Sequence, residues 1–237
     1  MEVTRCKSAD EAKEKLADRV SAELRRHSEN GIPVLFFFSG GSALSVLDMI
    51  DPECVGDFLT FAPIDERFDP SGETSNFSAF MRTDSFRKAE SAGAHFIDTR
   101  VKEWQGIAEL ADQFERAIRK WMTDFAKEGR IIAILGMGPD GHTAGIFPDD
   151  DENAFRDRFD GDRLVVGYRA PEYATCPERV TVTLSFLQNH IDAAFVFLSG
   201  EEKCTAWERV LRNREPPHRL PAEVFHAIRK TEAFTDL

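Results

Sequence analysis

The residues best suited to chemistry lie in the segment GMGPDGHTAGIFP, residues 136–148. This segment holds Asp140 and His142 two positions apart, and glycines and a proline surround them. An imidazole titrates near neutral pH and can act as a general base, and a nearby carboxylate can orient it. Glycine allows the unusual backbone angles that would aim such a side chain, while Pro139 limits the turn. The segment therefore predicts an acid–base site, although a single histidine beside glycines is more often structural.

This segment follows the apolar run 131–135, and three other apolar runs also end in polar residues. Because ligands bind beyond the carboxyl ends of the strands in open α/β sheets, we expect these residues to meet in one crevice. The runs and the residues that follow them are IPVLFFF (32–38) with Ser39-Gly40-Gly41-Ser42, LTFAPI (59–64) with Asp65-Glu66-Arg67, and AAFVFL (193–198) with Ser199-Gly200 and Lys203.

The segment 39–42 has the composition of an anion-binding turn. Its two glycines let backbone N–H groups approach a ligand, and the helix expected after it adds the positive end of a dipole. It matches neither the Walker A pattern nor GxGxxG. Taken singly, it is equally a plain strand–helix connection. Residues 65–67 alone are more often a solvated turn, and most helix lysines such as Lys203 are solvated.

Alternating helices and strands must position these strand ends. Ser8 and Glu11 form a capping-box pattern that opens a helix of about 20 residues, which Gly31 ends. Further strands are expected at 164–168 and 179–184, and a helix from 201 to about 212. The pattern predicts a doubly wound α/β fold with a mainly parallel sheet and helices on both faces, in one domain over residues 1–237. The apolar stripe of a further helix consists of Trp104, Ile107, Ala111, Phe114, Ile118, Trp121 and Phe125.

The stretch DDDENAFRDRFDGD (149–162) is rich in acidic residues. It lacks the DxDxDG order of a calcium-binding loop, so we expect a mobile, solvated surface loop there. No histidine has a partner at metal-ligand spacing, and we therefore expect no metal site.

Composition limits the classes of partner. The chain has 237 residues and a formal net charge of -12. Such a charge repels nucleic-acid phosphate and anionic lipid, so neither nucleic acid nor a membrane is an expected partner.

The four cysteines form no CxxC pair, which predicts free thiols in a reducing cytoplasm. The first residues lack the apolar core of a signal peptide, and the run 32–38 is too short to cross a bilayer.

In their order along the chain, these segments resemble the glucosamine-6-phosphate isomerase/6-phosphogluconolactonase family, and its lactonases in particular. GMGPDGHTAGIFP is similar to the lactonase signature GMGPDGHTASLFP, and FFFSGGSAL resembles the sugar-phosphate loop. PIDERF with Ser75-Asn76, PERVTVTLSFL and FVFLSGEEK resemble three further segments, and residues 221–236 resemble the C-terminal end. The resemblance covers the chain from about residue 33 to residue 236.

The resemblance implies a sugar-phosphate isomerase-like fold and hydrolysis of 6-phospho-D-glucono-1,5-lactone to 6-phosphogluconate, the second step of the oxidative pentose phosphate pathway. It implies no cofactor and no metal, and a monomer or small homo-oligomer is expected. His142 would take a proton from water and return one to the ring oxygen. Asp140, Asp65 or Glu66 would orient it, and the choice stays open. Arg67 or glycine N–H groups would stabilise the carbonyl oxygen. The residues implied in phosphate binding are Ser39, Gly40, Gly41, Ser42, Arg179 and Lys203.

Two alternatives stand beside the lactonase. Glucosamine-6-phosphate deaminases carry a signature similar to DGHIAFNEP, with an acidic residue before the proline where this chain has Phe147. A phenyl ring cannot transfer protons, and those enzymes usually have DEY in place of Asp65-Glu66-Arg67. A non-catalytic sugar-phosphate sensor would usually carry a DNA-binding segment, for which a single helix before residue 33 leaves no room.

Gly145 and Ile146 depart from the lactonase signature and are expected to change packing rather than chemistry.

Overall fold

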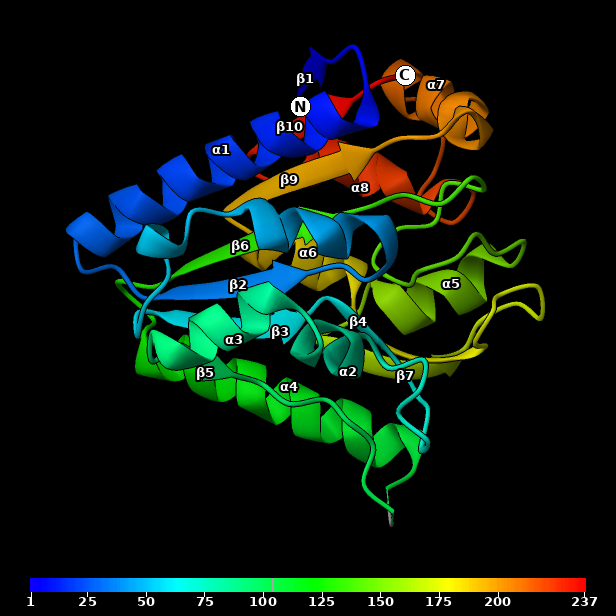
Figure 1. The fold of residues 1–237 in the computed structure, drawn as a ribbon. Coiled ribbons are helices and arrows are strands. Elements are labelled where there is room, and N and C mark those ends of the chain that lie inside the picture. Colours follow the sequence, from blue (N-terminus) through cyan, green and yellow to red (C-terminus); the bar gives the residue numbers. More distant parts are fainter. Residues whose placement is uncertain (104) are drawn as a thin grey trace.

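The computed structural model describes residues 1–103 and 105–237, and at its centre lies a sheet of seven parallel strands (Figure 1). This confirms the predicted α/β fold with a mainly parallel sheet. Trp104, the first residue of the predicted apolar stripe, lies outside the described residues. In spatial order the strands are β1 (Glu2–Arg5), β10 (Thr231–Thr235), β9 (Ala193–Leu198), β6 (Arg130–Leu135), β2 (Val34–Phe38), β3 (Leu59–Pro63) and β5 (His95–Phe96).

The central strands are buried on both faces, which explains why their sequences are apolar without alternation. Every residue of β2, β3 and β9 is buried. Successive side chains point to opposite faces of a strand. Leu35 and Phe37 of β2 accordingly belong to one hydrophobic cluster, whereas Val34, Phe36 and Phe38 belong to the other. The sheet thus separates two cores, each covered by its own helices.

Helices cover both faces of the sheet, as predicted, and the first helix begins at the predicted capping residue Ser8. Ser8 Oγ accepts a hydrogen bond from the N–H of Glu11 at 3.2 Å and caps the first helix. One face carries α1 (Ala9–Glu29), the 3₁₀ helices η1 (Gly41–Met49) and η2 (Pro52–Cys54), α2 (Asn76–Met81) and α3 (Asp84–Ser91). The other cluster includes residues of α4 (Ile107–Asp124), α6 (Leu184–His190), α7 (Cys204–Arg212) and α8 (Val224–Ala227), and the short 3₁₀ helices η3 (Glu201–Lys203) and η4 (Pro221–Glu223) precede α7 and α8.

A second sheet was not predicted. It is antiparallel and consists of β4 (Asp65–Arg67), β8 (Glu178–Val182) and β7 (Val165–Arg169), in the order β4-β8-β7. The strands expected at 164–168 and 179–184 therefore exist, but the expectation that they join a single parallel sheet is wrong. Residues 65–67 are also a strand rather than a solvated turn. The physical reason is the short connection 170–177, which returns the chain as an antiparallel pair instead of crossing over.

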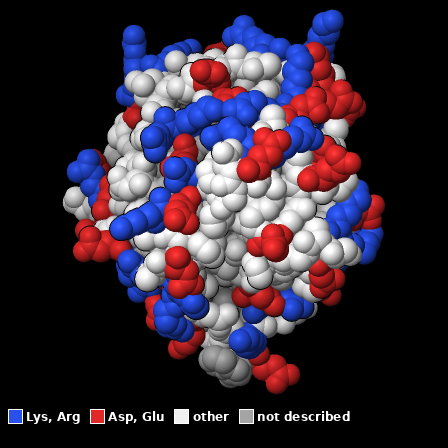
Figure 2. Space-filling view, turned by 90° about the vertical axis from the view of Figure 1, so that its left-hand side faces the viewer, with Lys and Arg blue, Asp and Glu red and all other residues white. Residues whose placement is uncertain are grey.

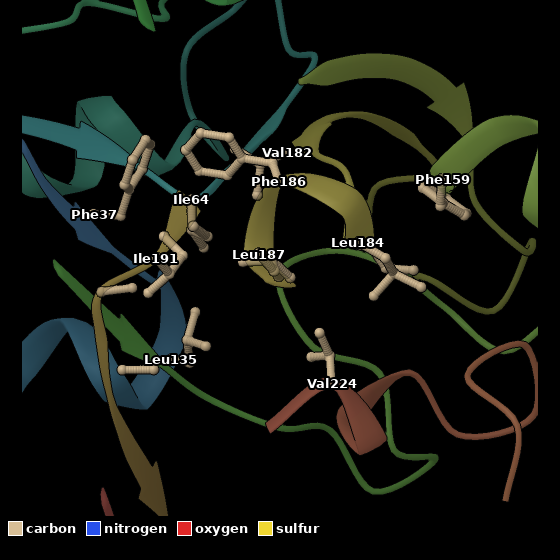
Figure 3. Packing of buried hydrophobic residues seen from close by; sticks show 14 of the residues in the cluster. Phe37, Ile64, Leu135, Phe159, Val182, Leu184, Phe186, Leu187, Ile191 and Val224 are labelled. Atoms are coloured by element: carbon tan, nitrogen blue, oxygen red, sulfur yellow. The ribbon is translucent and has the colours of Figure 1, made fainter. Parts of the chain in front are cut away.

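The small sheet and the large sheet share one hydrophobic cluster (Figure 3). Figure 3 shows Phe186 close to Phe37, and the centres of these two rings are 5.5 Å apart. Val182 of the small sheet and Ile64 belong to the same cluster and are fully buried. This shared core fixes the small sheet against the carboxyl ends of the large one, so the residues of β4 and β8 are held there firmly.

The expectation of a mobile loop at 149–162 is wrong, because this stretch contains α5 (Glu152–Phe159). The side chain of Asp151 accepts a hydrogen bond from the N–H of Ala154 at 3.0 Å and caps the helix. Phe155 and Phe159 are spaced by four residues, so both project from one face into the core. The acidic residues occupy the solvated face and hid this amphipathic pattern.

We predict that Phe159→Ala lowers the free energy of unfolding by about 3–5 kcal/mol, because it empties a fully buried site beside Phe155 and Tyr168. Urea denaturation followed by circular dichroism measures this loss. Arg156→Ala on the exposed face of the same helix is the control, and it should cost less than about 1 kcal/mol. Equal, small losses for both variants would mean that α5 does not belong to the core.

Candidate active site

The site lies where the strand order of the large sheet reverses. From β2 the chain continues to β3 on one side, and β6 pairs with β2 on the other side. The loops after β2 and β6 therefore diverge, and such a point leaves a crevice for ligands. The N–H of Ser39 still bonds the carbonyl of Ile134 at 3.1 Å, so both loops start from the same place.

A cavity of about 240 Å³ occupies this crevice. It brings together residues from four strand ends, as the sequence predicted. Two candidates, Asp140 and Glu66, lie outside the lining and contact its residues from behind. The candidate residues that line the cavity are Ser39, Gly40, Gly41, Ser42, Asp65, Arg67, His142, Arg179 and Lys203.

Asp140 is the carboxylate that contacts His142. Its Oδ1 lies 2.6 Å from Nδ1 of the imidazole and also accepts the backbone N–H of His142 at 3.1 Å. A carboxylate can only accept, so Nδ1 carries a proton, and in the neutral imidazole Nε2 then holds the lone pair. Burial alone would raise the pKa of Asp140, but the hydrogen bonds from His142 hold it below its usual value. The pair is therefore a charged carboxylate that orients the imidazole.

Two glycines make room for this arrangement. A Cβ atom at Gly138 would overlap the imidazole ring of His142, so the backbone can pass under the ring only without a side chain. Gly141, between Asp140 and His142, has φ of +87°, which L side chains rarely adopt. On its other face the imidazole stacks on Phe147, with ring centres 4.2 Å apart. The ring is thus held by a hydrogen bond, a stack and a close backbone contact.

The alternation of β4 decides which of its residues reach the cavity. Asp65 and Arg67 line it, while Glu66 between them points to the opposite side and is fully buried. The partner strand β8 obeys the same rule: Arg179 lines the cavity, whereas Val180 joins the core. Glu66 therefore contacts neighbouring residues and does not line the cavity.

The Glu66 carboxylate organises the back of the site. It accepts five hydrogen bonds, at 2.6–3.1 Å, and its burial raises its pKa. The donors come from β4 itself, from the start of α2 and from the segment after β5. They are the backbone N–H groups of Arg67, Asn76 and Phe77 and the hydroxyls of Ser75 and Thr99.

The lining of the cavity is positive although the chain is acidic. Arg67 and Arg179 stand directly opposite each other in the β4–β8 ladder, where two like charges repel. Asp65 relieves part of this repulsion through a buried ion pair with Arg179 at 3.0 Å. Lys203 approaches from the end of β9, and burial lowers its pKa. Three cations thus face one carboxylate, which favours an anionic ligand.

Arg67 carries a further sign of a ligand. Its Nη1 donates to the carbonyl of Thr74 at 3.2 Å, but its Nε is buried and has no hydrogen-bond partner among the described residues. Buried donors are almost always satisfied, by protein, water or ligand. The side chain of Arg67 lines the cavity, and among the described residues it makes only the hydrogen bond to Thr74.

A wider basic hollow lies at the other end of the sheet, where the strands begin, on the side that Figure 2 faces. Figure 2 shows Lys and Arg mixed with Asp and Glu over that side. Its cations are mostly neutralised: Arg19 and Arg26 pair with Glu23, Arg229 with Asp192, and Lys230 with Glu232. In the cavity beside His142, Arg179 pairs with Asp65, whereas Arg67 and Lys203 form no ion pair with the described residues.

Sequence reasoning missed three contributors to the site. Asn76 lines the cavity and donates through Nδ2 to the carbonyl of Asp65 at 2.9 Å, and it had been noted only as part of a resembling segment. Thr143 lines the cavity beside His142, and its hydroxyl bonds the carbonyl of Gly136 at 2.7 Å. Tyr173 bonds Asp140 at 3.1 Å, and nothing in the sequence pattern connects position 173 with position 140.

Within residues 1–103 and 105–237, no group of three His, Cys, Asp or Glu side chains is arranged to hold a metal ion. No helix in the same residues is long and apolar enough to cross a membrane.

Known proteins resemble this chain over most of its length. A family model described as glucosamine-6-phosphate isomerases/6-phosphogluconolactonase matches residues 7–234. A 6-phosphogluconolactonase from Mesorhizobium japonicum is 32% identical over 200 residues, which cover 81% of this chain and 78% of the relative. One from Thermotoga maritima is 31% identical over 172 residues, covering 72% of this chain and 68% of the relative.

Solved structures share the fold over almost the whole chain. The crystal structure of a 6-phosphogluconolactonase from Shewanella baltica has a TM-score of 0.77 and 20% identity, with 99% of this chain and 96% of the other covered. That of the Thermotoga maritima 6-phosphogluconolactonase has a TM-score of 0.73 and 25% identity, with 98% and 97% covered.

We predict that Glu66→Gln lowers the free energy of unfolding by about 1–3 kcal/mol, because the amide NH₂ would face donors that need an acceptor. Glu73→Gln, an exposed change in the nearby loop, should leave stability within about 0.5 kcal/mol. Thermal and urea unfolding of both variants measure the difference. A Glu66→Gln protein as stable as the parent would show that the five hydrogen bonds do not hold the back of the site.

Proposed function

This chain belongs to the glucosamine-6-phosphate isomerase/6-phosphogluconolactonase family, and from that premise we propose that it hydrolyses 6-phospho-D-glucono-1,5-lactone to 6-phospho-D-gluconate, the second step of the oxidative pentose phosphate pathway. The observation that carries the proposal is the Asp140–His142 pair at the edge of a cavity with three cations and one carboxylate. Such a cavity suits a small substrate with a phosphate at one end and an acyl carbon at the other.

The proposed reaction begins with water near Nε2 of His142. The lone pair of Nε2 takes a proton while the water oxygen forms a bond to C1 of the lactone. The carbonyl π bond opens, and negative charge moves to its oxygen. When the carbonyl re-forms, the bond from C1 to the ring oxygen breaks, and the imidazolium returns its proton to that oxygen. The product is a carboxylic acid, which ionises, and a free hydroxyl.

Asp140 supports both proton transfers. Because the pKa of Asp140 is held below its usual value, its carboxylate stays charged at neutral pH and favours the imidazolium that forms during attack. We assign stabilisation of the carbonyl oxygen to Arg67, since it lines the cavity together with His142 and only its Nη1 is hydrogen-bonded among the described residues. Asp65 holds Arg179 in place, and Glu66 holds the backbone of Arg67.

The phosphate is assigned to the segment 39–42 together with Arg179 and Lys203. Gly40 lies so close to Asn76 that a Cβ atom would overlap its side chain, so the position requires glycine. Gly40 and Gly41 line the cavity, where their backbone can approach a ligand. Ser39 and Ser42 supply hydroxyl donors, and the charge of the phosphate would offset the unbalanced cations.

The deaminase alternative is disfavoured by Phe147. In the signature of that branch an acidic residue precedes the proline, and here a buried phenyl ring occupies the position and stacks on His142 at 4.2 Å. Ring opening and amine release need an additional acid–base group, which a phenyl ring does not supply.

We further propose that the protein works in the cytoplasm as a monomer or small homo-oligomer and takes no nucleic acid. Four free cysteines suit a reducing compartment, and a net charge of -12 repels phosphate backbones.

The proposal is tested by following the lactone, generated in situ, with ³¹P and ¹³C NMR. Added protein should speed formation of 6-phosphogluconate well above the spontaneous rate, which is subtracted. Glucosamine 6-phosphate should release no ammonia. Binding of the lactone without faster hydrolysis would instead support a sugar-phosphate sensor and contradict the proposal.

We predict that Lys203→Ala raises KM roughly 10- to 100-fold, the equivalent of one charge-assisted hydrogen bond, and leaves kcat within a few-fold. The reason is that an anchor remote from C1 binds the ground state and the transition state alike. Lys127→Ala, an exposed change away from the cavity, is the matched control. A kcat reduced a hundredfold at unchanged KM would place Lys203 at the reacting carbon instead.

A further inference from the structure

The connection between β7 and β8, residues 170–177, forms a tight loop beside the His142–Phe147 stack. The N–H of Ala170 bonds the carbonyl of Pro177 at 2.6 Å, and the N–H of Ala174 bonds that of Pro171 at 2.9 Å. Ala174 is buried, so the loop is anchored at its middle as well as at its ends. It can therefore hold a side chain in a fixed direction.

Tyr173 extends from this loop and is 67% exposed, more than any other large hydrophobic side chain among those described as exposed. Its hydroxyl nevertheless donates to Oδ2 of Asp140 at 3.1 Å. Its ring meets the edge of Phe147, with centres 5.9 Å apart and planes at 72°. An exposed tyrosine contributes little to the core, so these contacts need another explanation than packing.

The same loop also contacts the cations of the cavity. The carbonyl of Cys176 accepts a hydrogen bond from Nε of Arg179 at 2.7 Å. Arg179 in turn lies over the ring of Phe147, 5.7 Å from its centre. The loop thus connects the orienting carboxylate, the stacked ring and a cavity arginine through three separate contacts.

The hydrogen bonds divide the Asp140 carboxylate into two halves. Oδ1 accepts both donors of His142, and Oδ2 accepts Tyr173. Without the phenol, Oδ2 would face solvent, and the carboxylate could rotate away from the imidazole. Partial burial and the charge of Asp140 raise the pKa of Tyr173 to about 12, so the phenol keeps its proton and remains a donor at neutral pH.

We propose that Tyr173 is a positioning residue, which fixes the carboxylate of Asp140 so that the imidazole of His142 keeps one orientation toward the cavity. The proposal rests on the proposed function for its catalytic consequence. Tyr173 lies outside the cavity lining in the part of the chain that the structure describes, and it borders an adjacent hollow with Phe147 and Tyr168. It should therefore affect turnover rather than substrate binding.

Other charged groups also act on His142 and stay unchanged in the test. Asp65 and Arg67 of β4, Arg179 of β8 and Lys203 of η3 face it across the cavity. Asp140 is the charged group in contact with the ring. The Tyr173 hydroxyl is one of the donors that lower the pKa of Asp140, against the effect of burial. Its removal lets Asp140 take up a proton at higher pH.

The test compares Tyr173→Phe with Glu172→Gln, an exposed neighbour in the same loop. We expect Tyr173→Phe to lower kcat about fivefold, the equivalent of one hydrogen bond, with KM within twofold of the parent. The acid limb of its kcat profile should move to higher pH. The reason is that, as the pH is lowered, the Asp140 carboxylate of the variant takes up a proton at a higher pH than that of the parent. Glu172→Gln should match the parent in all three quantities.

A second measurement does not depend on the reaction. In the parent, the Nδ1 proton of His142 should give a downfield ¹H NMR resonance, which should exchange with water several-fold faster in Tyr173→Phe as Asp140 becomes mobile. If the parent does not hydrolyse the lactone, the proposed function fails, and this exchange rate still decides the role of Tyr173. Unchanged exchange, or unchanged kcat and pH profile in an active parent, would overturn the proposal.

Discussion

The hydrogen bond between Asp140 and Nδ1 of His142 is the interaction on which the site depends. At 2.6 Å it fixes the tautomer of the imidazole and leaves Nε2 as the basic nitrogen. Two glycines of the surrounding backbone make this bond possible. Gly138 leaves space for the imidazole ring, and Gly141 turns the chain between Asp140 and His142. Flexible residue types thus produce a rigid local arrangement once the loop packs against Phe147 and Leu220.

The small antiparallel sheet supplies the charge that the imidazole lacks. Alternation in β4 directs Asp65 and Arg67 into the cavity and Glu66 away from it, and β8 adds Arg179 opposite Arg67. Two facing arginines are unfavourable without a counter-charge, and Asp65 only partly compensates them. In a chain with a net charge of -12, this local excess of positive charge is best explained by an anionic substrate.

Much of the fold and site was predictable because strand ends in a parallel sheet converge. The apolar runs that precede Ser39, Asp65 and Gly136 predicted both the sheet and the crevice. The small sheet was not predictable from periodicity, since pairing between residues 65–67 and 179–181 is a long-range property. The helix α5 was hidden by acidic residues around Phe155 and Phe159, and the contact of Tyr173 with Asp140 depends on how a loop folds back. The alternation of side chains along β4 decided which neighbouring carboxylate, Asp65 or Glu66, lines the cavity.

We propose that His142 removes a proton from the attacking water. The rate of lactone hydrolysis by a His142→Asn variant tests this role. Asparagine keeps the size and polarity of the position but cannot accept the proton. We expect a folded protein that still binds the sugar phosphate and whose lactone hydrolysis, corrected for the spontaneous reaction, is roughly 10²- to 10⁴-fold slower. A folded His142→Asn protein with the full corrected rate would show that His142 is not the general base.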